Sequence, residues 1–253
     1  VSWQFSYDKF YKGGDRIYRI NYFEYQQQQP VLASARTHDR TATLVQSYTP
    51  QVAAVARIYN EKAYVFTEDV RLVDQDMLFA DSTFFDVFPV KVLQGDARTA
   101  LAPPKSVMIS ASQAKVYFGD ADPMGKTLYF NERLPFIVTG VFEDIPSNSS
   151  IDFDFLLSWS TMPFYGWISR DGDFRAPWTF TYVRLKENAG DLAPINAGLT
   201  RMANEHITTL EKRRHTARYE LQPYESLHTS PALSGEIKPT TSRILLYALL
   251  SLA

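Results

Sequence analysis

Four histidines are the residues of this chain best suited to metal or acid–base chemistry: His38, His206, His215 and His228. His206 and His215 are nine positions apart across the end of a predicted helix, so they do not share one helical face as a metal-binding pair would. We interpret His206, which borders an apolar stripe, as a hydrogen-bonded packing residue. Because the chain has no cysteine, a zinc site would need at least two of these histidines together with carboxylates.

Two pairs of aspartates, Asp74 with Asp76 and Asp152 with Asp154, are each separated by one residue. On a strand, such a pair shares one face and could bind a hard cation or act as a general acid and base. No glycine follows at the position that a calcium-binding loop requires. We therefore favour a solvated strand face or a turn at both pairs, and a soluble hydrolase that uses either pair is one alternative.

Motifs for nucleotide binding and for nucleophilic catalysis are missing from the sequence. Residues 118–126 contain two glycines and a lysine, but Asp120 and Asp122 would repel phosphate and no helix is predicted after Lys126. Neither a P-loop, a dinucleotide-binding glycine motif nor a G-x-S-x-G sequence is present. We therefore expect no catalytic, cofactor-binding or metal-binding residues, and we expect that the domain is not an enzyme.

Composition indicates a globular chain without a nucleic-acid partner. Its 253 residues suffice for one large or two small domains, and 26 basic against 28 acidic residues give a net charge of −2. This balance does not predict binding to nucleic acid or to an anionic membrane surface. The absence of cysteine is compatible with an oxidising compartment. Fifteen tyrosines favour strand-rich structure with half-buried rings.

The last ten residues, 244–253, form an apolar run with no charge after Arg243. A membrane-spanning helix needs about 20 such residues. We predict that 244–253 is the start of a truncated transmembrane helix, with a short buried helix as the alternative. No signal peptide is visible at the start of the sequence.

Local patterns predict alternating strands and helices in the first half of the chain. Alternation predicts a strand at 16–22, the polar run 26–30 predicts a loop, and 41–47 predicts a helix. Strands are predicted at 52–59 and 63–67, joined by a turn at Asn60-Glu61.

The middle of the chain has the clearest helix and turn signals. Asp81 is predicted to cap a short helix that ends at Pro89. The strand 106–109 leads into a helix that begins with a capping box of Ser110 and Gln113 and ends at Gly119. Segments 126–130 and 136–142 then predict a β-hairpin that turns near Asn131, and Gly140 marks a point where another backbone approaches.

The last third of the chain predicts a β-α-β unit. Strands at 180–186 and 218–222 flank one long helix over 191–214, whose basic end (Lys212 to Arg214) suits a helix C-terminus. An ordered loop is expected at 159–178, and its aromatic residues form either a contact surface or a plug beneath the loop. We predict a mixed α/β fold of the α+β class.

Several blocks of sequence, in order and at characteristic spacing, carry a resemblance to a known family. The blocks are Phe79 to Phe88, Gly95-Asp96, Ala100 to Ser110, Ala114 to Gly119 with Asp122 to Lys126, and Phe136 to Ser149. Together they resemble the MacB-like periplasmic core domain of FtsX-related ABC transporter permeases of the Bacteroidetes type. Ser150 replaces the histidine that is usual in the family. The resemblance is weaker at 8–10, 15–19 and 221–228.

The resemblance implies an extracytoplasmic domain between the first two transmembrane helices of a permease in the bacterial inner membrane, facing the periplasm. It implies a porter-like β-α-β subdomain formed by residues 1–71 and 159–230, and an inserted small α/β, sabre-like lobe at 72–158. Such a domain is noncatalytic and transmits ATP-driven motion of a partner ATPase to the export or extraction of a substrate. The implied partners are a cytoplasmic ABC ATPase subunit and a second permease copy, and a periplasmic adaptor or substrate protein is a further candidate. The alternative is the ligand-binding sensor domain of a membrane receptor.

Overall fold

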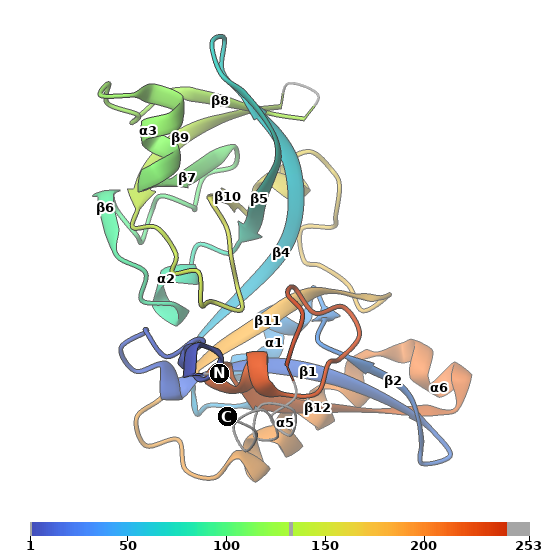
Figure 1. Ribbon diagram of the computed structural model, residues 1–253. Helices are drawn as coiled ribbons and strands as arrows, with labels where there is room; N and C mark the ends of the chain where they lie inside the picture. Colours follow the sequence, from blue (N-terminus) through green and yellow to red (C-terminus); the bar gives the residue numbers. More distant parts are fainter. Residues whose placement is uncertain (1, 132–133, 242–253) are drawn as a thin grey trace. The chain divides into compact units, whose positions relative to one another are not determined.

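The computed structural model describes residues 2–131 and 134–241, and the chain divides into two compact units (Figure 1). Unit 1 contains the described residues of 1–57, 148–150 and 171–253, and unit 2 contains those of 58–147 and 151–170. The sequence prediction placed an inserted lobe at 72–158. Unit 2 begins earlier than that lobe, at Ile58 within a strand, and residues 148–150 belong to unit 1. The predicted helix at 244–253 lies outside the described residues.

Unit 1 is a mixed α/β unit whose sheet is built from both halves of the chain. Its strands are β1 (Ile17–Gln26), β2 (Gln29–Ser34), β3 (Thr37–His38), the first part of β4 (Val52–Phe66), β11 (Pro177–Leu185) and β12 (His215–Pro223). Its α-helices are α1 (Thr41–Tyr48), α5 (Leu192–His206) and α6 (Thr208–Arg213), and short 3₁₀ helices lie at Ser2–Ser6, Gly14–Arg16 and Tyr224–Thr229.

The sheet of unit 1 has the order β12-β1-β11-β4, with β2 paired to β1 and β3 to β11. Both β11 and β12 are antiparallel to β1, so they are parallel to each other, and α5 and α6 connect them. This arrangement confirms the β-α-β unit predicted from the sequence, with β1 inserted between its two strands. Helix α5 packs its apolar side on the sheet through buried residues that include Ile195, Leu199 and Met202.

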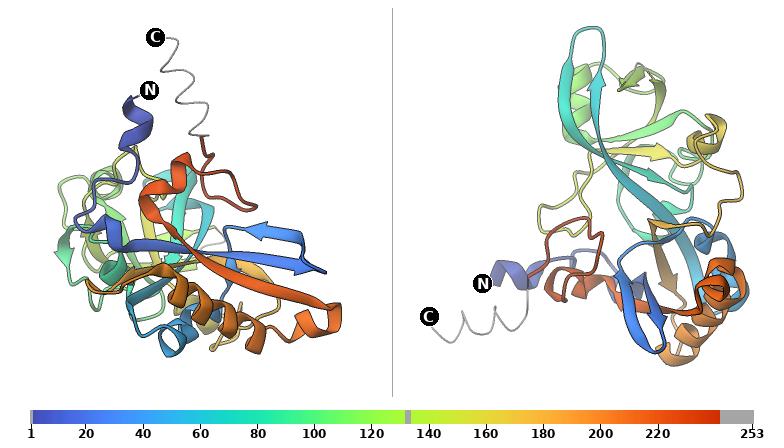
Figure 2. Two further views of the ribbon diagram at one scale, coloured as in Figure 1. Left: turned by 90° about the horizontal axis from the view of Figure 1, so that it is seen from below. Right: turned by 90° about the vertical axis from the view of Figure 1, so that its right-hand side faces the viewer.

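The outer edge of β12 is covered by side chains of α5 that are spaced four residues apart. The Asn204 amide oxygen accepts a bond from the Ala217 N–H at 3.0 Å, and its NH₂ group donates to the Ala217 carbonyl at 2.7 Å. One turn earlier, the Thr200 hydroxyl bonds both backbone groups of Tyr219. One turn before that, the Asn196 side chain accepts from the Leu221 N–H at 2.9 Å. Figure 2 shows α5 alongside β12. The helix therefore satisfies the backbone groups of an edge strand that another chain could otherwise pair with.

Two predictions about elements of unit 1 and β4 are wrong at specific residues. The expected turn at Asn60-Glu61 does not form, because these residues pair with Leu78 and Met77 of β5 and keep β4 a continuous strand. The long helix breaks at Ile207 into α5 and α6. The polar run 26–30, which the sequence predicted to be a loop or break, contains the tight turn at Gln27 and Gln28 that joins β1 to β2.

Unit 2 is a second mixed α/β unit. Its strands are the rest of β4, β5 (Arg71–Ala80), β6 (Val92–Gly95), β7 (Ser106–Ser110), β8 (Thr127–Phe130), β9 (Leu134–Phe142) and β10 (Phe155–Ser158). Its helices are α2 (Phe84–Val87), α3 (Ala111–Phe118) and α4 (Thr161–Phe164). The strand order is β4-β5-β10-β7-β9-β6, and β8 pairs with β4 and β9. Strands β5 and β10 are parallel, as are β7 and β9.

The start of α3 confirms half of the predicted capping box. The Ser110 hydroxyl accepts a bond from the Gln113 N–H at 3.3 Å. The reciprocal bond is absent, because the Ser110 N–H donates to the Asp154 carbonyl at 2.9 Å and the Gln113 side chain bonds the Asp154 carboxylate. Gly119 has a φ of 60°, as expected of a residue that ends a helix.

Gly140 lies where the sequence predicted a close backbone approach. A Cβ atom at this position would lie 3.0 Å from the Gln94 carbonyl oxygen and 2.4 Å from the Met108 methyl group. Opposite it, Gly95 has a φ of 89° and leaves no room for a Cβ beside Thr139. The pair of glycines therefore lets β6 lie close against β9.

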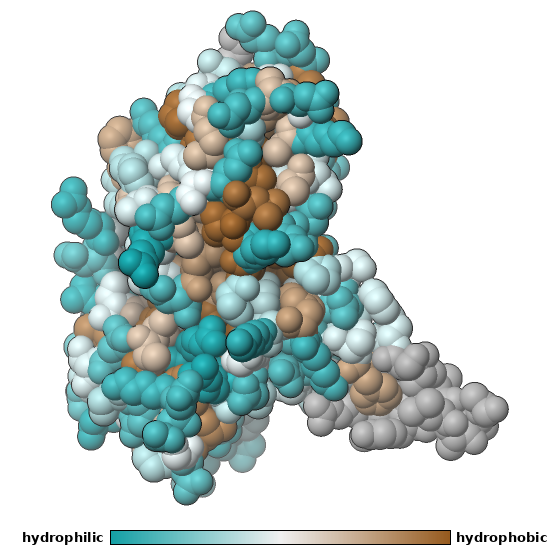
Figure 3. All heavy atoms as spheres, turned by 90° about the vertical axis from the view of Figure 1, so that its left-hand side faces the viewer, coloured by the Kyte–Doolittle hydropathy of each residue, from teal (hydrophilic) through white to brown (hydrophobic). Residues whose placement is uncertain are grey.

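One face of the molecule is largely hydrophilic, with hydrophobic side chains gathered in a limited area (Figure 3). Large hydrophobic side chains that are exposed within the described residues are Trp3, Val31, Tyr64, Val73, Leu93, Val116, Ile137, Phe164 and Trp167. Phe164 and Trp167 are close in sequence and belong to the segment whose role the sequence left open.

Candidate functional site

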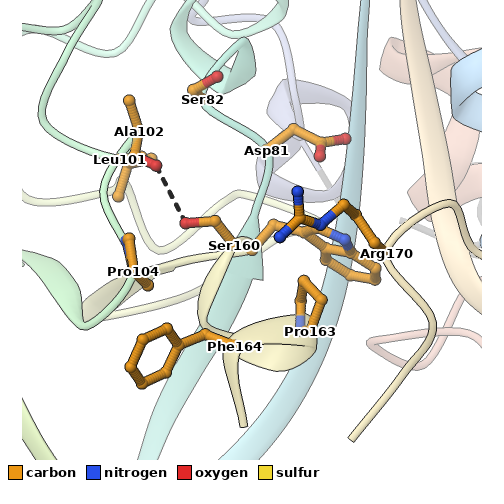
Figure 4. A pocket seen from close by; sticks show the side chains of 10 residues that line it. Asp81, Ser82, Leu101, Ala102, Pro104, Ser160, Pro163, Phe164 and Arg170 are labelled. Carbon is orange, nitrogen blue, oxygen red and sulfur yellow. Dashed lines mark hydrogen bonds between the residues drawn. The ribbon is translucent and has the colours of Figure 1, made fainter. Parts of the chain in front are cut away.

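A pocket of unit 2 lies at the C-terminal ends of two neighbouring strands (Figure 4). Strands β5 and β10 are parallel and pair Ala80 with Ser158 at their ends. The residues that follow each strand therefore meet at one edge of the sheet, where ligands commonly bind in α/β proteins. The cavity measures about 400 Å³ and is lined by Asp81, Ser82, Leu101, Ala102, Pro104, Trp159, Ser160, Pro163, Phe164 and Arg170.

Hydrogen bonds fix the loop at 100–105 against the start of α4. The Ser160 hydroxyl donates to the Ala102 carbonyl at 3.0 Å, a bond drawn in Figure 4. The Lys105 N–H donates to the Thr161 hydroxyl at 2.9 Å, and the Ser158 and Ser160 hydroxyls lie 2.6 Å apart. The two walls of the pocket are thus joined through backbone groups, so its shape is largely formed before any ligand arrives.

Phe164, which lines this pocket, belongs to a cluster of aromatic rings and one lysine. Lys105 has a φ of 61°, and its Nζ lies 4.7 Å from the ring centre of Phe164 and 5.3 Å from that of Tyr165. Tyr165 stacks on Trp167, whose indole also contacts Phe79 edge to face. The Phe164 side chain is 56% exposed and Trp167 is 48% exposed. Exposed rings held in place by neighbours are typical of protein contact surfaces.

The polar groups of the pocket suit binding rather than catalysis. Figure 4 shows the Arg170 side chain extending into the pocket on the side of Asp81. No histidine is among the lining residues, so neither Ser82 nor Ser160 has an imidazole there to activate its hydroxyl. The pocket therefore offers an apolar interior with a few charged groups at its mouth.

A second candidate is a buried polar network in unit 1 that connects β1 with residues near the end of the described chain. Arg19, whose side chain is 2% exposed, forms a two-pronged ion pair with Glu236, with Nη2 and Oε1 at 2.8 Å. The same guanidinium donates to Gln222 and to Asn21, each at 2.9 Å. Burial lowers the pKa of Arg19. The hydrogen bond and the charge of Glu236 raise this pKa by more than burial lowers it, so the pKa of Arg19 lies above its usual value.

Asp8 fixes the N-terminal segment to residues 148–150. Its carboxylate accepts bonds from the Ser150 N–H at 2.7 Å and from the Ser150 hydroxyl at 2.6 Å. The Asp8 N–H donates to the Asn148 carbonyl at 2.9 Å. Burial raises the pKa of Asp8 above its usual value, and the bonds from Ser150 offset only part of this rise.

The N-terminal and C-terminal segments also contact each other directly. The ring of Tyr7 stacks on His228 with centres 3.6 Å apart, and Nε2 of His228 hydrogen-bonds Gln4. The Thr241 N–H donates to the His228 carbonyl at 2.7 Å. Residues 2–8 and 224–241 are therefore joined by packed and hydrogen-bonded side chains within one unit.

The other histidines noted in the sequence occupy separate structural positions. Nδ1 of His38 lies 2.9 Å from the Tyr219 hydroxyl oxygen, and burial lowers the pKa of His38 to about 4. His206 bonds the Tyr48 hydroxyl at 3.0 Å, as expected of a packing residue. His215 pairs with Glu24 on the neighbouring strand. No group of three histidine, aspartate or glutamate side chains in the described residues is placed to hold a metal ion.

One aspartate of each sequence pair, Asp76 and Asp154, makes a structural contact. Asp76 forms an exposed ion pair with Lys62 at 3.5 Å. The Asp154 carboxylate accepts a bond from the Ser110 hydroxyl at 3.0 Å beside the start of α3. Burial raises the pKa of Asp154, and the bonds from Ser110 and Gln113 offset part of this effect. The arrangement at Asp154 therefore supports the cap of a helix, where negative charge is favourable.

The aromatic residues of this segment occupy different positions. Phe164 lines the unit 2 pocket and Tyr165 stacks on Trp167, whereas Phe174 stacks on His206 and Phe180 is fully buried in unit 1. Sequence reasoning missed the pocket itself and the pair of Arg19 with Glu236. Both depend on contacts between distant segments, and only the exposed aromatics gave a signal for the pocket.

The chain belongs to the family of MacB-like periplasmic core domains, whose sequence profile matches residues 3–200. This confirms the resemblance seen in the sequence, and the mixed α/β fold class is confirmed with it. The family defines the chain as a periplasmic domain of an ABC transporter permease. No protein with curated function matches the chain significantly. Within the described residues, no helix has the length and apolar character needed to cross a membrane.

Solved structures of similar domains agree with this assignment. A domain of a protein described as a permease, from Porphyromonas gingivalis, is 25% identical, with a TM-score of 0.70 over 95% of this chain and 98% of its own. The periplasmic region of MacB from Actinobacillus actinomycetemcomitans is 16% identical, with a TM-score of 0.54 over 79% and 93%. The extracellular domain of the noncanonical ABC-type transporter YknZ from Gram-positive bacteria is 15% identical, with a TM-score of 0.57 over 81% and 99%.

Proposed function

We propose that this domain transmits ATP-driven motion of a partner ATPase to the export or extraction of a substrate on the periplasmic side of the inner membrane. In this role the domain performs no chemistry, and ATP hydrolysis takes place on a separate nucleotide-binding subunit or domain. Unit 1 would serve as the porter-like part and unit 2 as the sabre-like part. Membership of a permease family favours this role over that of a receptor sensor.

The observation that carries the proposal is the joining of residues 2–8 to residues 224–241. The Tyr7–His228 stack and the His228–Gln4 bond connect these segments to each other. The pair of Arg19 with Glu236 connects the second segment to the sheet of unit 1. In a permease with a membrane helix on each side of the domain, a movement of either helix would thus reach the sheet through buried contacts instead of being absorbed by loose linkers.

The partners that follow from this role are a cytoplasmic ABC ATPase and a second copy of the permease. A periplasmic adaptor or a substrate protein would receive the motion. The proposed cellular position is the inner membrane of a bacterium, with this domain in the periplasm.

The absence of cysteine allows a direct test by site-specific spin labelling. Lys115 is exposed on α3, so Lys115→Cys gives one label per permease in a full-length protein whose other cysteines, outside this domain, are replaced by serine. With the ATPase present in a lipid bilayer, the distance between labels on two permease copies should change when ATP replaces ADP. With an ATPase variant that binds but does not hydrolyse ATP, the label distance should stay at the value of the ATP-bound state. A label distance that is the same in every nucleotide state would contradict transmission, and the lack of any inter-copy distance would contradict the dimer.

A further inference from the structure

We propose that Asp8 and Asp39 are positioning residues that pass movement of unit 1 into the chain segments from which unit 2 is built. This role rests on the proposed function, because it names the residues through which the transmitted motion would leave unit 1. The contacts concerned all lie within unit 1, at the points where the chain crosses to unit 2.

Within the described residues, the chain crosses between the two units four times. It leaves unit 1 after Arg57 and returns to it at Asp171. Between these points, segment 148–150 enters from unit 2 and goes back to it, so both ends of this segment are crossings. A crossing with few contacts would absorb movement by local opening. How firmly unit 1 holds each crossing therefore determines how much movement the chain passes on.

Asp8 holds both ends of segment 148–150. Its N–H donates to the Asn148 carbonyl at 2.9 Å, and its carboxylate accepts bonds from the N–H and the hydroxyl of Ser150. Asp8 is buried, and its φ of 62° is uncommon for a residue other than glycine. Such a backbone conformation persists where the surrounding contacts fix it. Asp8 is therefore held in the position from which it reaches both Asn148 and Ser150.

Asp39 holds the other two crossings. Nη1 of Arg57, the last residue of unit 1 before the first crossing, donates to the Asp39 carbonyl at 2.8 Å. The Asp39 carboxylate accepts a bond from the Asp173 N–H at 2.7 Å, just after the chain has returned at Asp171. Gly172 has a φ of 70°, and a Cβ atom there would lie 3.1 Å from the Asp39 carboxylate. The returning segment therefore lies directly against the buried Asp39.

The two terminal segments of unit 1 are also bonded to residues 148–150. The Asn148 amide group donates to the Ser6 carbonyl at 2.9 Å. The Lys238 ammonium group donates to the Ser149 carbonyl at 2.9 Å. The N-terminal and C-terminal segments, which would receive the motion of the membrane helices, therefore each contact the segment that Asp8 holds.

Spin labels in the two units test these roles in the full-length permease, with the ATPase present in a lipid bilayer. Lys115→Cys places a label in unit 2, and Lys212→Cys places one at an exposed position of α6 in unit 1. In otherwise wild-type protein, replacing ADP with ATP should change the distance between permease copies for both labels. Asp8→Gly removes the carboxylate without straining the backbone. It should reduce the change at the Lys115 label by about half or more and preserve the change at the Lys212 label.

Two further variants separate the carboxylate of Asp8 from a general effect of substitution. Asp15→Gly, at an exposed aspartate of the N-terminal part of the chain, should leave both label distances as in the wild type. Asp8→Asn should restore most of the change at the Lys115 label. Asparagine tolerates the left-handed conformation, and its amide oxygen accepts a bond from the Ser150 N–H.

Asp39→Ala tests the other two crossings, and its effect on the Lys115 label should resemble that of Asp8→Gly. Hydrogen exchange in the same samples should accelerate about tenfold or more in peptides that contain Asp173. The control is Asp171→Ala, at an exposed aspartate of the same segment, which should change neither exchange nor label distances. Wild-type exchange over the rest of the chain shows that each variant is folded.

The two labels distinguish a failure of this role from a failure of the proposed function. A change at the Lys115 label that is as large in Asp8→Gly and Asp39→Ala as in the wild type would overturn the inference. An equal loss at both labels would overturn it as well, because the aspartates would then serve only the stability of unit 1. No change at either label in the wild type would contradict the transmission of motion itself, and with it the roles of both aspartates.

A smaller change keeps the test decisive if Asp8→Gly does not fold. Ser150→Ala removes only the hydroxyl bond to the Asp8 carboxylate. It should reduce the change at the Lys115 label in the same direction and to a smaller extent than Asp8→Gly. An undiminished change in Ser150→Ala, together with one in Asp39→Ala, would overturn the inference.

Discussion

At the scale of single residues, His38 shows how the fold controls the charge of a side chain. The imidazole is 2% exposed, contacts Tyr22 and Phe174, and lies within hydrogen-bond distance of the Tyr219 hydroxyl. Burial lowers its pKa from 6.5 to about 4, although the charges of Glu24 and Asp173 act in the opposite direction. The folded protein therefore contains a neutral His38 over a pH range in which the unfolded chain is protonated there.

This difference predicts a loss of stability in mild acid. Since the unfolded state binds the proton more readily, the stabilising effect of neutral His38 is complete above pH 6.5 and is lost as the pH falls towards 4. Between about pH 7 and pH 5, His38 should lower the free energy of unfolding by about 2 kcal/mol. Chemical denaturation at the two pH values measures the change.

The matched variant is His38→Gln, which keeps hydrogen-bonding groups but does not titrate. Other groups, such as Asp8 with its raised pKa, change the stability of both proteins in the same way. The difference in pH dependence between wild type and variant therefore belongs to His38. Identical pH dependence of the two proteins would show that His38 remains accessible to protonation in the folded state.

At the scale of elements, the contact between α5 and β12 replaces the strand that the sheet lacks on this side. Asn196, Thr200 and Asn204 occur at intervals of one helical turn, which places them on one face. Backbone groups of Ala217, Tyr219 and Leu221 point to that face because alternate residues of a strand direct their hydrogen-bonding groups to the same side. Side chains spaced four residues apart on the helix therefore line up with backbone groups spaced two residues apart on the strand.

Removal of one of these three side chains should weaken the contact between α5 and the edge strand β12. Asn204→Ala leaves the N–H and C=O of Ala217 to water, and because Asn204 is exposed we expect a loss of about 1 kcal/mol in the free energy of unfolding. Amide hydrogen exchange at Ala217 should accelerate as well. Arg201→Ala, an exposed change on the same helix, should cost less than about 0.5 kcal/mol and leave exchange at Ala217 unchanged. Unchanged exchange in Asn204→Ala would indicate that the side-chain bonds contribute nothing at this edge.

At the scale of the whole molecule, the pair of Arg19 with Glu236 connects residues 217 positions apart. The guanidinium is nearly inaccessible to water, and its donors are met by Glu236, Gln222 and Asn21. A buried cation that loses its carboxylate is strongly destabilising, because it retains the cost of leaving water without the compensating charge.

Glu236→Gln should therefore lower the free energy of unfolding by about 3 kcal/mol. It should also increase hydrogen exchange at Ser234, whose N–H donates to the Ala33 carbonyl in the same region. The control is Glu187→Gln, because Glu187 is 82% exposed and its pair with Arg16 spans 3.7 Å. That change should cost less than about 0.5 kcal/mol. Equal effects of the two variants would mean that the buried pair does not hold residues 224–241 in place.

The sequence by itself determined the features that depend on a few consecutive residues. The Ser110 cap, the positive φ of Gly119 and the hairpin of β8 with β9 follow from side-chain and backbone bonds within single turns or between adjacent strands. The ordered blocks between Phe79 and Ser149 were sufficient for the family. These features could be read from the sequence because the groups that form them are neighbours along the chain.

Only the tertiary structure decided the features that depend on distant pairings. β4 passes without a turn through Asn60 and Glu61 because β5 supplies partners for their backbone groups. The unit 2 pocket exists because β5 and β10 end side by side, which brings the residues that follow them, Asp81 and Ser160, to one edge of the sheet. Pairing between strands and the burial of charge depend on which surfaces meet in the folded chain, and no local pattern of residues specifies that choice.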